Sequence, residues 1–298
     1  MKILVPLDTS TLAERALPTA VAIAIARDAS EVRLLLVHEP VPIAGFPDAP
    51  WNAARSTIER TYIEDKAHEM RARLATSVAS EFAIGSPAHT IADTAAMTEA
   101  DLIVMTTHGR TGLSRAWLGS VADAVMRSTN VPVLMLRPDD SHGAEPPHGF
   151  ARVLLPLDGS SGAERVLGDA VALAGRGATY VLTRVVHPIP LILPGAGGYG
   201  MTSMTDADAT NRAVAAAKDY LATVAGQLRE RGVTHVNEHV EIGDHTAPML
   251  IELAKAERVD LIAIAARGRG AARLLLGSVA DKLLRGTSLP LLVIHRVA

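Results

Sequence analysis

Two glycine-rich stretches in this chain of 298 residues have the residue types and spacing of a phosphate-binding loop. The first reads TTHGRTGLSRAWLGSV from Thr106, and the second reads AARGRGAARLLLGSV from Ala265. Each follows a short apolar run typical of a strand and ends in Leu-Gly-Ser-Val-Ala-Asp, which is typical of a helix start. Backbone N–H groups and the helix dipole favour an anion at such a place. Tight turns that need glycine would explain the same residues without a ligand.

Polar residues next to these glycines could also contribute to phosphate binding. Arg110 and Arg269 follow loop glycines and could pair with phosphate. Ser120 and Ser278 are good helix-start residues, and no motif supplies a histidine base for either, so neither is interpreted as a nucleophile. We therefore predict binding at these loops and name no catalytic residue.

One aspartate follows the first apolar run of each half. Asp8 and Asp158 could cap helices, but Thr11-Leu12-Ala13-Glu14 and its counterpart from Ser161 fit a capping box. If the capping box supplies the caps, the aspartates are available for a ribose hydroxyl or a phosphate-bound Mg²⁺. Asp8 is therefore a candidate metal contact by way of that Mg²⁺.

Histidines are weaker candidates. His38 and His187 are interpreted as strand-end histidines with structural partners. His235 and His239 are four residues apart, but THVNEHVEIG reads as a strand, so a zinc site is disfavoured. The P-loop, G-x-G-x-x-G and G-x-S-x-G motifs are absent at the relevant places, which disfavours a P-loop NTPase, a dinucleotide dehydrogenase and an α/β-hydrolase.

Composition narrows the class of protein. Hydrophobic residues make up 48% and aromatic residues only 3%, so the core must consist of aliphatic side chains, as in strands covered on both faces. The net charge of −3 gives no bias toward nucleic acid or an anionic membrane. There is no cysteine, no apolar run long enough for a bilayer and no signal-peptide pattern in MKILVPLD. We expect a cytoplasmic protein without nucleic-acid or membrane partners.

The chain repeats itself, which predicts two domains. KILVPLDTSTLAERAL matches RVLLPLDGSSGAERVL, with Asp8 and Asp158 150 positions apart. The predicted domains span residues 1–138 and 151–298, and the polar, Pro- and Gly-rich residues 139–150 form the predicted linker.

Each half is expected to alternate strands and helices, which predicts a parallel sheet with helices on both faces. Ligands then bind outside the carboxyl ends of the strands. The second half repeats the order, with a Gly-rich loop at 188–204. In the first half, the expected strands are 3–7, 32–38, 82–85, 101–106 and 131–137, and the expected helices are 11–27, 56–80, 88–100 and 119–128.

The last apolar runs, VPVLML and LPLLVI, begin near Pro132 and Pro290. Open edges this apolar would invite aggregation, and proline at a strand start is tolerated. We therefore expect the two runs to pair with each other, which would pack the halves as a pseudo-twofold pair.

At this point the residues resemble the universal stress protein family in its tandem form. The P-L-D starts, the V-H strand end, D-L-I-V-M and H-G-R carry the resemblance, with a motif of Gly, two residues, Gly, nine residues, Gly and Ser or Thr. Gly109 and Gly119 keep the nine-residue spacing, whereas Gly268 and Gly277 are separated by eight residues. Thr106 and Ala265 stand at the first glycine of the motif.

The resemblance implies two Rossmann-like domains and binding of ATP or a related adenine nucleotide. It places Pro6 and Asp8 by ribose and phosphate, the main chain of Glu39 on adenine and Met105 near the base. Around the phosphates it implies the first-half residues Gly109, Gly119, Ser120 and Val121, to which the position of Arg110 adds a candidate. The counterparts in the second half are Pro156, Asp158, Pro188, Ile264, Gly268, Gly277, Ser278 and Val279.

Three functions follow as hypotheses: nucleotide-dependent regulation in a stress response, slow ATP hydrolysis, and an assembly module without nucleotide. We expect the first domain to bind more tightly, because the second loop is one residue shorter and Pro188 lacks the N–H that Glu39 can give. The tandem chain is expected to act as an intramolecular pair, and whether it forms a homodimer is left open.

Overall fold

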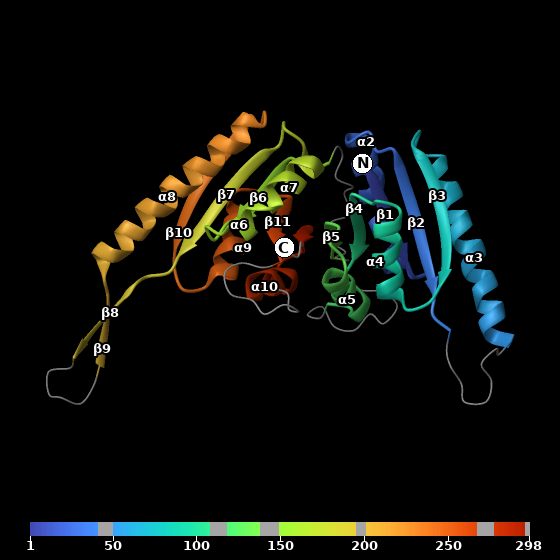
Figure 1. Cartoon of the computed structure of the whole chain (residues 1–298), viewed down its shortest axis with the longest axis horizontal. Helices are drawn as coiled ribbons and strands as arrows, with labels where there is room; N and C mark the ends of the chain where they lie inside the picture. The colour runs from blue at the N-terminus through green and yellow to red at the C-terminus, as the bar shows by residue number, and fades with distance from the viewer. Residues whose placement is uncertain (41–49, 108–117, 138–148, 195–200, 267–276, 296–298) are drawn as a thin grey trace.

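The computed structural model describes residues 1–40, 50–107, 118–137, 149–194, 201–266 and 277–295. In this part of the chain, one ten-stranded sheet crosses the whole molecule in the order β10-β7-β6-β11-β12-β5-β4-β1-β2-β3 (Figure 1). The sheet strands are β1 Lys2–Leu7, β2 Glu31–His38, β3 Ser77–Ile84, β4 Leu102–Thr106, β5 Val133–Leu136, β6 Arg152–Pro156, β7 Thr179–Val186, β10 His235–Ile242, β11 Leu261–Ala265 and β12 Leu291–Ile294.

Within each half the strands of this sheet are parallel, and helices cover both of its faces. The order of strands reverses between β1 and β4, and between β6 and β11, so each half has one switch point where a ligand crevice is expected. The α/β fold predicted from the alternating pattern is confirmed. The helices are α1 Thr11–Glu14, α2 Ala16–Ala26, α3 Pro50–Arg71, α4 Pro87–Met97, α5 Ser120–Ser128, α6 Ser161–Glu164, α7 Val166–Ala174, α8 Ala207–Glu230, α9 Thr246–Ala256 and α10 Ser278–Gly286.

The halves join through β5 and β12, which pair antiparallel with Leu134 opposite Leu292. Both leucines are fully buried. The carbonyls of Pro132 and Pro290 accept hydrogen bonds from the N–H groups of Ile103 and Ile262, at 2.9 and 3.0 Å. The predicted pairing of the two apolar runs is therefore confirmed, and neither run is left as an open edge.

The hydrophobic core is continuous across this junction. One cluster of buried side chains lies on one face of the sheet and contains Leu134 of the first half and Leu292 of the second. The other cluster contains Met135 and Leu291. Because each layer includes side chains from both halves, separating the halves would expose apolar surface on both faces of the sheet.

Two boundaries in the first half were predicted wrongly. The helix expected over 56–80 begins at Pro50 and ends at Arg71, and the third strand is Ser77–Ile84 instead of four residues. All eight residues of β3 pair with β2. The charged residues of the expected helix end at Arg73, and the uncharged residues that follow it form most of a strand paired along its whole length with β2. The helix expected over 11–27 is divided at Arg15 into α1 and α2.

The middle of the second half also differs from the prediction. Residues 188–204, expected as a Gly-rich loop, include a two-stranded antiparallel sheet of β8 Pro190–Pro194 and β9 Met201–Thr205. Figure 1 shows this hairpin extending away from the ten-stranded sheet. The β-branched and aliphatic residues on either side of 195–200 account for strand formation there.

A buried contact between a histidine and a glutamate attaches α3 to the end of β2. The Nδ1 atom of His38 lies 2.6 Å from Oε2 of Glu59, and both residues are 2% exposed. The Nε–H of Arg55 donates to the other oxygen of Glu59 at 2.8 Å. His38 thus has a structural partner, as the sequence indicated.

The second half replaces this pair with apolar residues. Tyr62 and Tyr220, 158 positions apart, donate equivalent hydrogen bonds to Glu14 and Glu164. The same offset puts the fully buried Ala217 where the first half has Glu59. The carbonyls of His38 and Val186 accept equivalent bonds from Gly85 and Gly243, so Val186 takes the place of His38.

This comparison yields a prediction of stability. His38→Val alone leaves the Glu59 carboxylate buried with one partner fewer, which should lower the free energy of unfolding by about 3–5 kcal/mol. The double change His38→Val and Glu59→Ala copies the second half and should cost clearly less, because it also removes the buried carboxylate that the single change leaves under-paired. Denaturant unfolding of both variants measures this. A double variant as unstable as the sum of the single changes would contradict it.

Candidate functional site

The first candidate site lies where β1 and β4 end and α5 begins. The N–H of Gly119 donates to the carbonyl of Thr107 at 2.7 Å, and the N–H of Thr107 donates to the carbonyl of Leu136 at 2.8 Å. Gly119 is the N-cap of α5, with φ −61° and ψ 145°. Ser120 is exposed, and Val121 is 37% exposed. The first turn of α5 is therefore accessible at the carboxyl edge of the sheet and can receive an anion.

The second half repeats this anchor. The N–H of Gly277 donates to the carbonyl of Ala266, again at 2.7 Å, and Gly277 caps α10 with φ −58° and ψ 146°. The second loop is one residue shorter than the first, and this spacing predicts that the start of its helix is shifted. That prediction is wrong, because Gly277 is bonded to the end of its strand at the same distance and with nearly the same backbone angles as Gly119.

Some predicted residues cannot be placed. Gly109, Arg110, Gly268 and Arg269 lie outside the described residues. Thr107 and Ala266, whose carbonyls hold the helix starts, were missed in the sequence. Their signal was weak, because only the backbone of each residue takes part.

Asp8 directly follows β1, which ends at Leu7, and the Asp8 carboxylate accepts the hydrogen bonds that organise the turn. Its Oδ1 accepts hydrogen bonds from the N–H of Ser10 at 3.0 Å and from the Ser10 hydroxyl at 2.6 Å. The Ser10 hydroxyl in turn accepts from the N–H of Ala13, so Ser10 is the N-cap of α1. The predicted capping box at Thr11 is thus wrong by one residue. Asp8 supports the cap through Ser10 instead of being released by it.

Asp158 does the same in the second half. Its Oδ1 accepts from the N–H and the hydroxyl of Ser160 at 2.9 and 2.6 Å, and Ser160 caps α6. The cap predicted at Ser161 is also one residue too late. Each aspartate therefore holds a fixed position at the carboxyl edge.

The predicted counterpart of Glu39 in the second half, Pro188, is wrong by one residue. Pro6 pairs with Leu35 in the first half, and Pro156 pairs with Thr183 in the second. This register makes His187, not Pro188, the counterpart of Glu39. His187 is exposed, and its Nε2 lies 3.4 Å from the Thr246 hydroxyl. The second half therefore has a backbone N–H at this position, contrary to the sequence-based expectation.

The remaining predicted residues are divided between core and surface. Met105 and Ile264 are 6% and 7% exposed and belong to the apolar cluster that β4 and β11 share with the helices. Val279 packs partly against the same cluster. Pro6 is buried, and Pro156 is half-buried. These side chains mainly pack in the core beneath the candidate sites, so they could contact a ligand only through their few exposed atoms.

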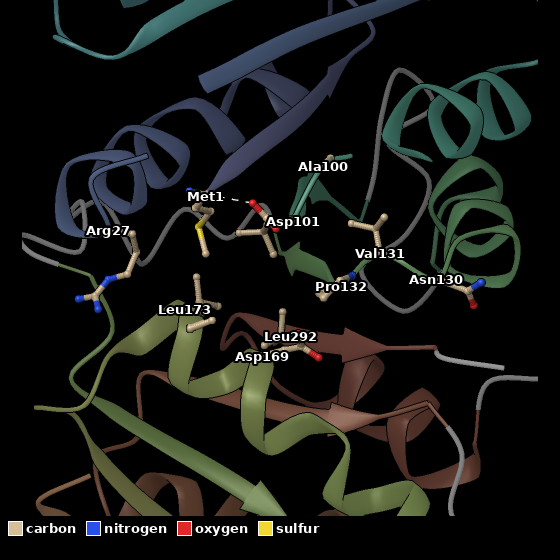
Figure 2. Close-up of a pocket in the computed structure, with 12 residues that line it drawn as sticks. Met1, Arg27, Ala100, Asp101, Asn130, Val131, Pro132, Asp169, Leu173 and Leu292 are labelled. Atoms are coloured by element: carbon tan, nitrogen blue, oxygen red, sulfur yellow. Dashed lines mark ion pairs between the residues drawn. The ribbon is translucent and has the colours of Figure 1, made fainter. Parts of the chain in front are cut away.

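A cavity of about 450 Å³ lies between the halves, away from both candidate sites (Figure 2). Met1, Asp101 and Pro132 contribute to it just before β1, β4 and β5, at the amino ends of these strands. Asp169 and Leu173 of α7 form the opposite wall. Because the candidate sites are at the carboxyl ends, this cavity is a separate feature of the junction.

Neither a metal cluster nor a membrane span is found in the described part of the chain. No group of three or more His, Asp or Glu residues is placed there to hold a metal ion. His235 and His239 lie on β10, the strand predicted for them, and His239 pairs with Glu257 at 3.4 Å. None of the described helices is long and apolar enough to cross a bilayer.

The fold defines a tandem α/β protein in which each half has a glycine at the start of a helix, bonded to the end of a strand at the carboxyl edge of the sheet. The chain belongs to the universal stress protein family, whose family model matches residues 1–137 and again residues 149–295. It is 34% identical over 139 residues to the universal stress protein MJ0531 of Methanocaldococcus jannaschii, covering 46% of this chain and 81% of that protein.

Solved structures also align with this chain. A universal stress protein from Archaeoglobus fulgidus matches 99% of this chain and 96% of its own, with a TM-score of 0.70 and 20% identity, which supports the fold. A universal stress protein in complex with cAMP aligns with 47% of this chain and 98% of its own, with a TM-score of 0.36 and 24% identity.

Strain next to Asp8 gives a second prediction of stability. Thr9 has a φ of 69°, a left-handed conformation that is costly for a β-branched residue, whereas Gly159 has the equivalent place with a φ of 83°. Thr9→Gly should raise the free energy of unfolding by about 0.5–1 kcal/mol, because relief of strain exceeds the entropy cost of glycine. Thermal unfolding measures this. Gly159→Thr is the reciprocal control and should destabilise, and a destabilised Thr9→Gly variant would refute the argument.

Proposed function

We propose that this universal stress protein binds ATP or a related adenine nucleotide and that binding regulates its associations in a stress response. The accessible helix start at Ser120, fixed to β4 through the Gly119–Thr107 bond, is the observation that carries the proposal. Membership of the family supports the adenine nucleotide as ligand. The absence of cysteine supports a reducing compartment such as the cytoplasm.

In this proposal the phosphates lie at the N-terminus of α5, within reach of the N–H groups of Ser120 and Val121. Gly109 and Arg110 contribute from the loop, Asp8 and Pro6 lie by the ribose, and the N–H of Glu39 faces the adenine. The carboxylate of Asp8 fits a phosphate-bound Mg²⁺, since Mg²⁺ in such sites takes one or two carboxylates and keeps several waters. The Ser10 bonds aim one oxygen of Asp8 at the turn, which fixes the carboxylate for that contact.

We propose the first domain, residues 1–138, as the main site. It keeps the nine-residue spacing of the family motif, and the His38–Glu59 pair fixes the end of β2 just before Glu39. In the second domain, residues 151–298, Val186 and Ala217 take the places of that pair, and the residues after His187 lead into the β8–β9 hairpin. The adenine end of the crevice is therefore better fixed in the first domain.

Two other functions remain as competing proposals. A slow ATP hydrolase would use the same site, but no described residue combines the position and partner of a general base there. An assembly module would have lost nucleotide binding, which the Thr106 and Ala265 departures from the motif favour. Nucleotide retained through purification, identified by mass spectrometry, separates binding from the assembly module, and single-turnover kinetics test for hydrolysis.

Proline at the helix start tests the site without adding bulk. Gly119 and Gly277 already have the extended backbone that must precede proline, and proline is favoured at the first helical position. Ser120→Pro removes one N–H donor to phosphate, which should weaken ATP binding about 10-fold or more. Ser278→Pro should leave the tight site within about 2-fold, since it acts on the weaker site. Isothermal titration of the whole chain measures both.

Ser120→Ala is the matched control for this pair, because it keeps the backbone N–H. Changes at the glycines are less clean. A Cβ at Gly277 would lie 2.8 Å from the carbonyl oxygen of Ala266 and disturb the anchor itself. Equal effects of Ser120→Pro and Ser278→Pro, or two equal sites in wild type, would overturn the preference for the first domain.

Asp8→Asn tests the proposed Mg²⁺ contact. Asparagine can still accept the two Ser10 hydrogen bonds through its carbonyl oxygen, so the turn should persist. ATP affinity should fall about 5-fold or more in Mg²⁺ and change little in EDTA, because only the metal contact needs the charge. Titrations in both buffers, with Asp158→Asn as the control, measure this. Wild-type affinity of Asp8→Asn for ATP–Mg²⁺ would show that Asp8 has no such role.

A further inference from the structure

An arginine of the first domain holds a helix of the second. Arg137 directly follows β5, and its Nη1 donates to the carbonyl oxygens of Arg285 at 3.0 Å and Thr287 at 3.1 Å. Arg285 is in the last turn of α10, and Thr287 is its C-cap. Carbonyls at this end have no partner inside the helix, and a cation there also interacts favourably with the helix dipole. Arg137 therefore caps α10 from across the domain boundary.

The other end of α10 is the second candidate phosphate site. Gly277, its N-cap, ends the second glycine-rich stretch and is bonded to the end of β11. Since α10 has only nine residues, a shift along its axis at one end is transmitted to the other. The arginine at the C-terminus thus helps to set where the N–H groups of Ser278 and Val279 lie.

The backbone next to Arg137 is tied to the first candidate site. The carbonyl of Leu136 accepts from the N–H of Thr107, and the carbonyl of Thr107 accepts from the N–H of Gly119. Two hydrogen bonds therefore connect the start of α5 to Leu136, and the next residue in the chain, Arg137, bonds to the end of α10. Leu136 is the last residue of β5, the strand that pairs with β12 in the middle of the sheet (Figure 1).

Charges on the two helices also interact across the junction. The hydrogen bond and charge of Asp281 raise the pKa of Arg285, and Asp123 of α5 raises it further. Two helices that begin at the two candidate sites are thus close enough for their side chains to influence one another.

The two halves have different residues at this position. The N–H groups of Thr107 and Ala266 donate to Leu136 and Ile294, so the residue after Ile294, His295, takes the place of Arg137 in the second half. Arg137 carries a permanent charge with several donors, which a histidine does not match.

We propose that Arg137 is a positioning residue for the second nucleotide site and couples it to the first. The coupling rests on the proposed function, because it requires nucleotide at the first site. The capping of α10 does not, and it is measurable without any ligand.

Hydrogen exchange of the whole protein, followed by mass spectrometry, tests the cap without nucleotide. Arg137→Ala should speed exchange in the α10 peptide about 10-fold, because two charge-assisted hydrogen bonds are lost. Arg137→Lys should restore part of the protection, since lysine keeps the charge but has no fork of donors. Arg71→Ala is the matched control, because Arg71 donates to a carbonyl, that of Val78, within one domain. Exchange in α10 that is unchanged by Arg137→Ala would overturn the proposal.

A second measurement adds ATP to chains that carry Ser278→Pro, so that nucleotide acts through the first site. ATP should slow exchange in α10 about 5-fold with Arg137 present and have no effect on it in Arg137→Ala. Calorimetry must show that the first site still binds in both chains. Protection that persists in Arg137→Ala would refute the coupling. Failure of the wild type to bind ATP would instead refute the proposed function, and exchange without nucleotide would still decide whether Arg137 caps α10.

Discussion

The organisation of the molecule depends on the pairing of β5 with β12. Each is the last strand of its half, buried on both faces, and would be an exposed apolar edge alone. Their antiparallel pairing turns two five-stranded sheets into one and places α5 and α10 on either side of the junction. Both candidate sites lie at the starts of these helices, so the pairing that joins the two sheets also sets the distance between the sites.

The sequence predicted the features that depend on repeated backbone patterns. Alternating apolar runs and helical spacing gave the fold, and the two glycine-rich stretches gave the helix starts at Ser120 and Ser278. Predictions failed where tertiary contacts decide. The full length of β3 depends on its pairing with β2. The N-cap of α1 is Ser10, one residue before the Thr11 that the capping-box pattern indicates, and Ser10 is held by the Asp8 carboxylate.

Register was the least predictable property of the site. His38 and His187 look equivalent in the sequence, because each is close to the end of an apolar run. The pairing of Pro6 with Leu35 and of Pro156 with Thr183 shows that His187 matches Glu39 instead. A shift of one residue changes which face of the sheet a side chain occupies, so His38 is buried against Glu59 while His187 is exposed. No local pattern distinguishes these two environments.

The covalent link between the halves affects which substitutions the pair can accumulate. Two halves in one chain meet at an effective concentration that dilution cannot lower, so their junction does not need the affinity of a free dimer. In a symmetric homodimer, every substitution at the interface appears twice. Here one side can change alone, as Arg137 opposite His295 and the His38–Glu59 pair opposite Val186 and Ala217 illustrate. Duplication within one chain thus permits a division of labour that identical subunits cannot have.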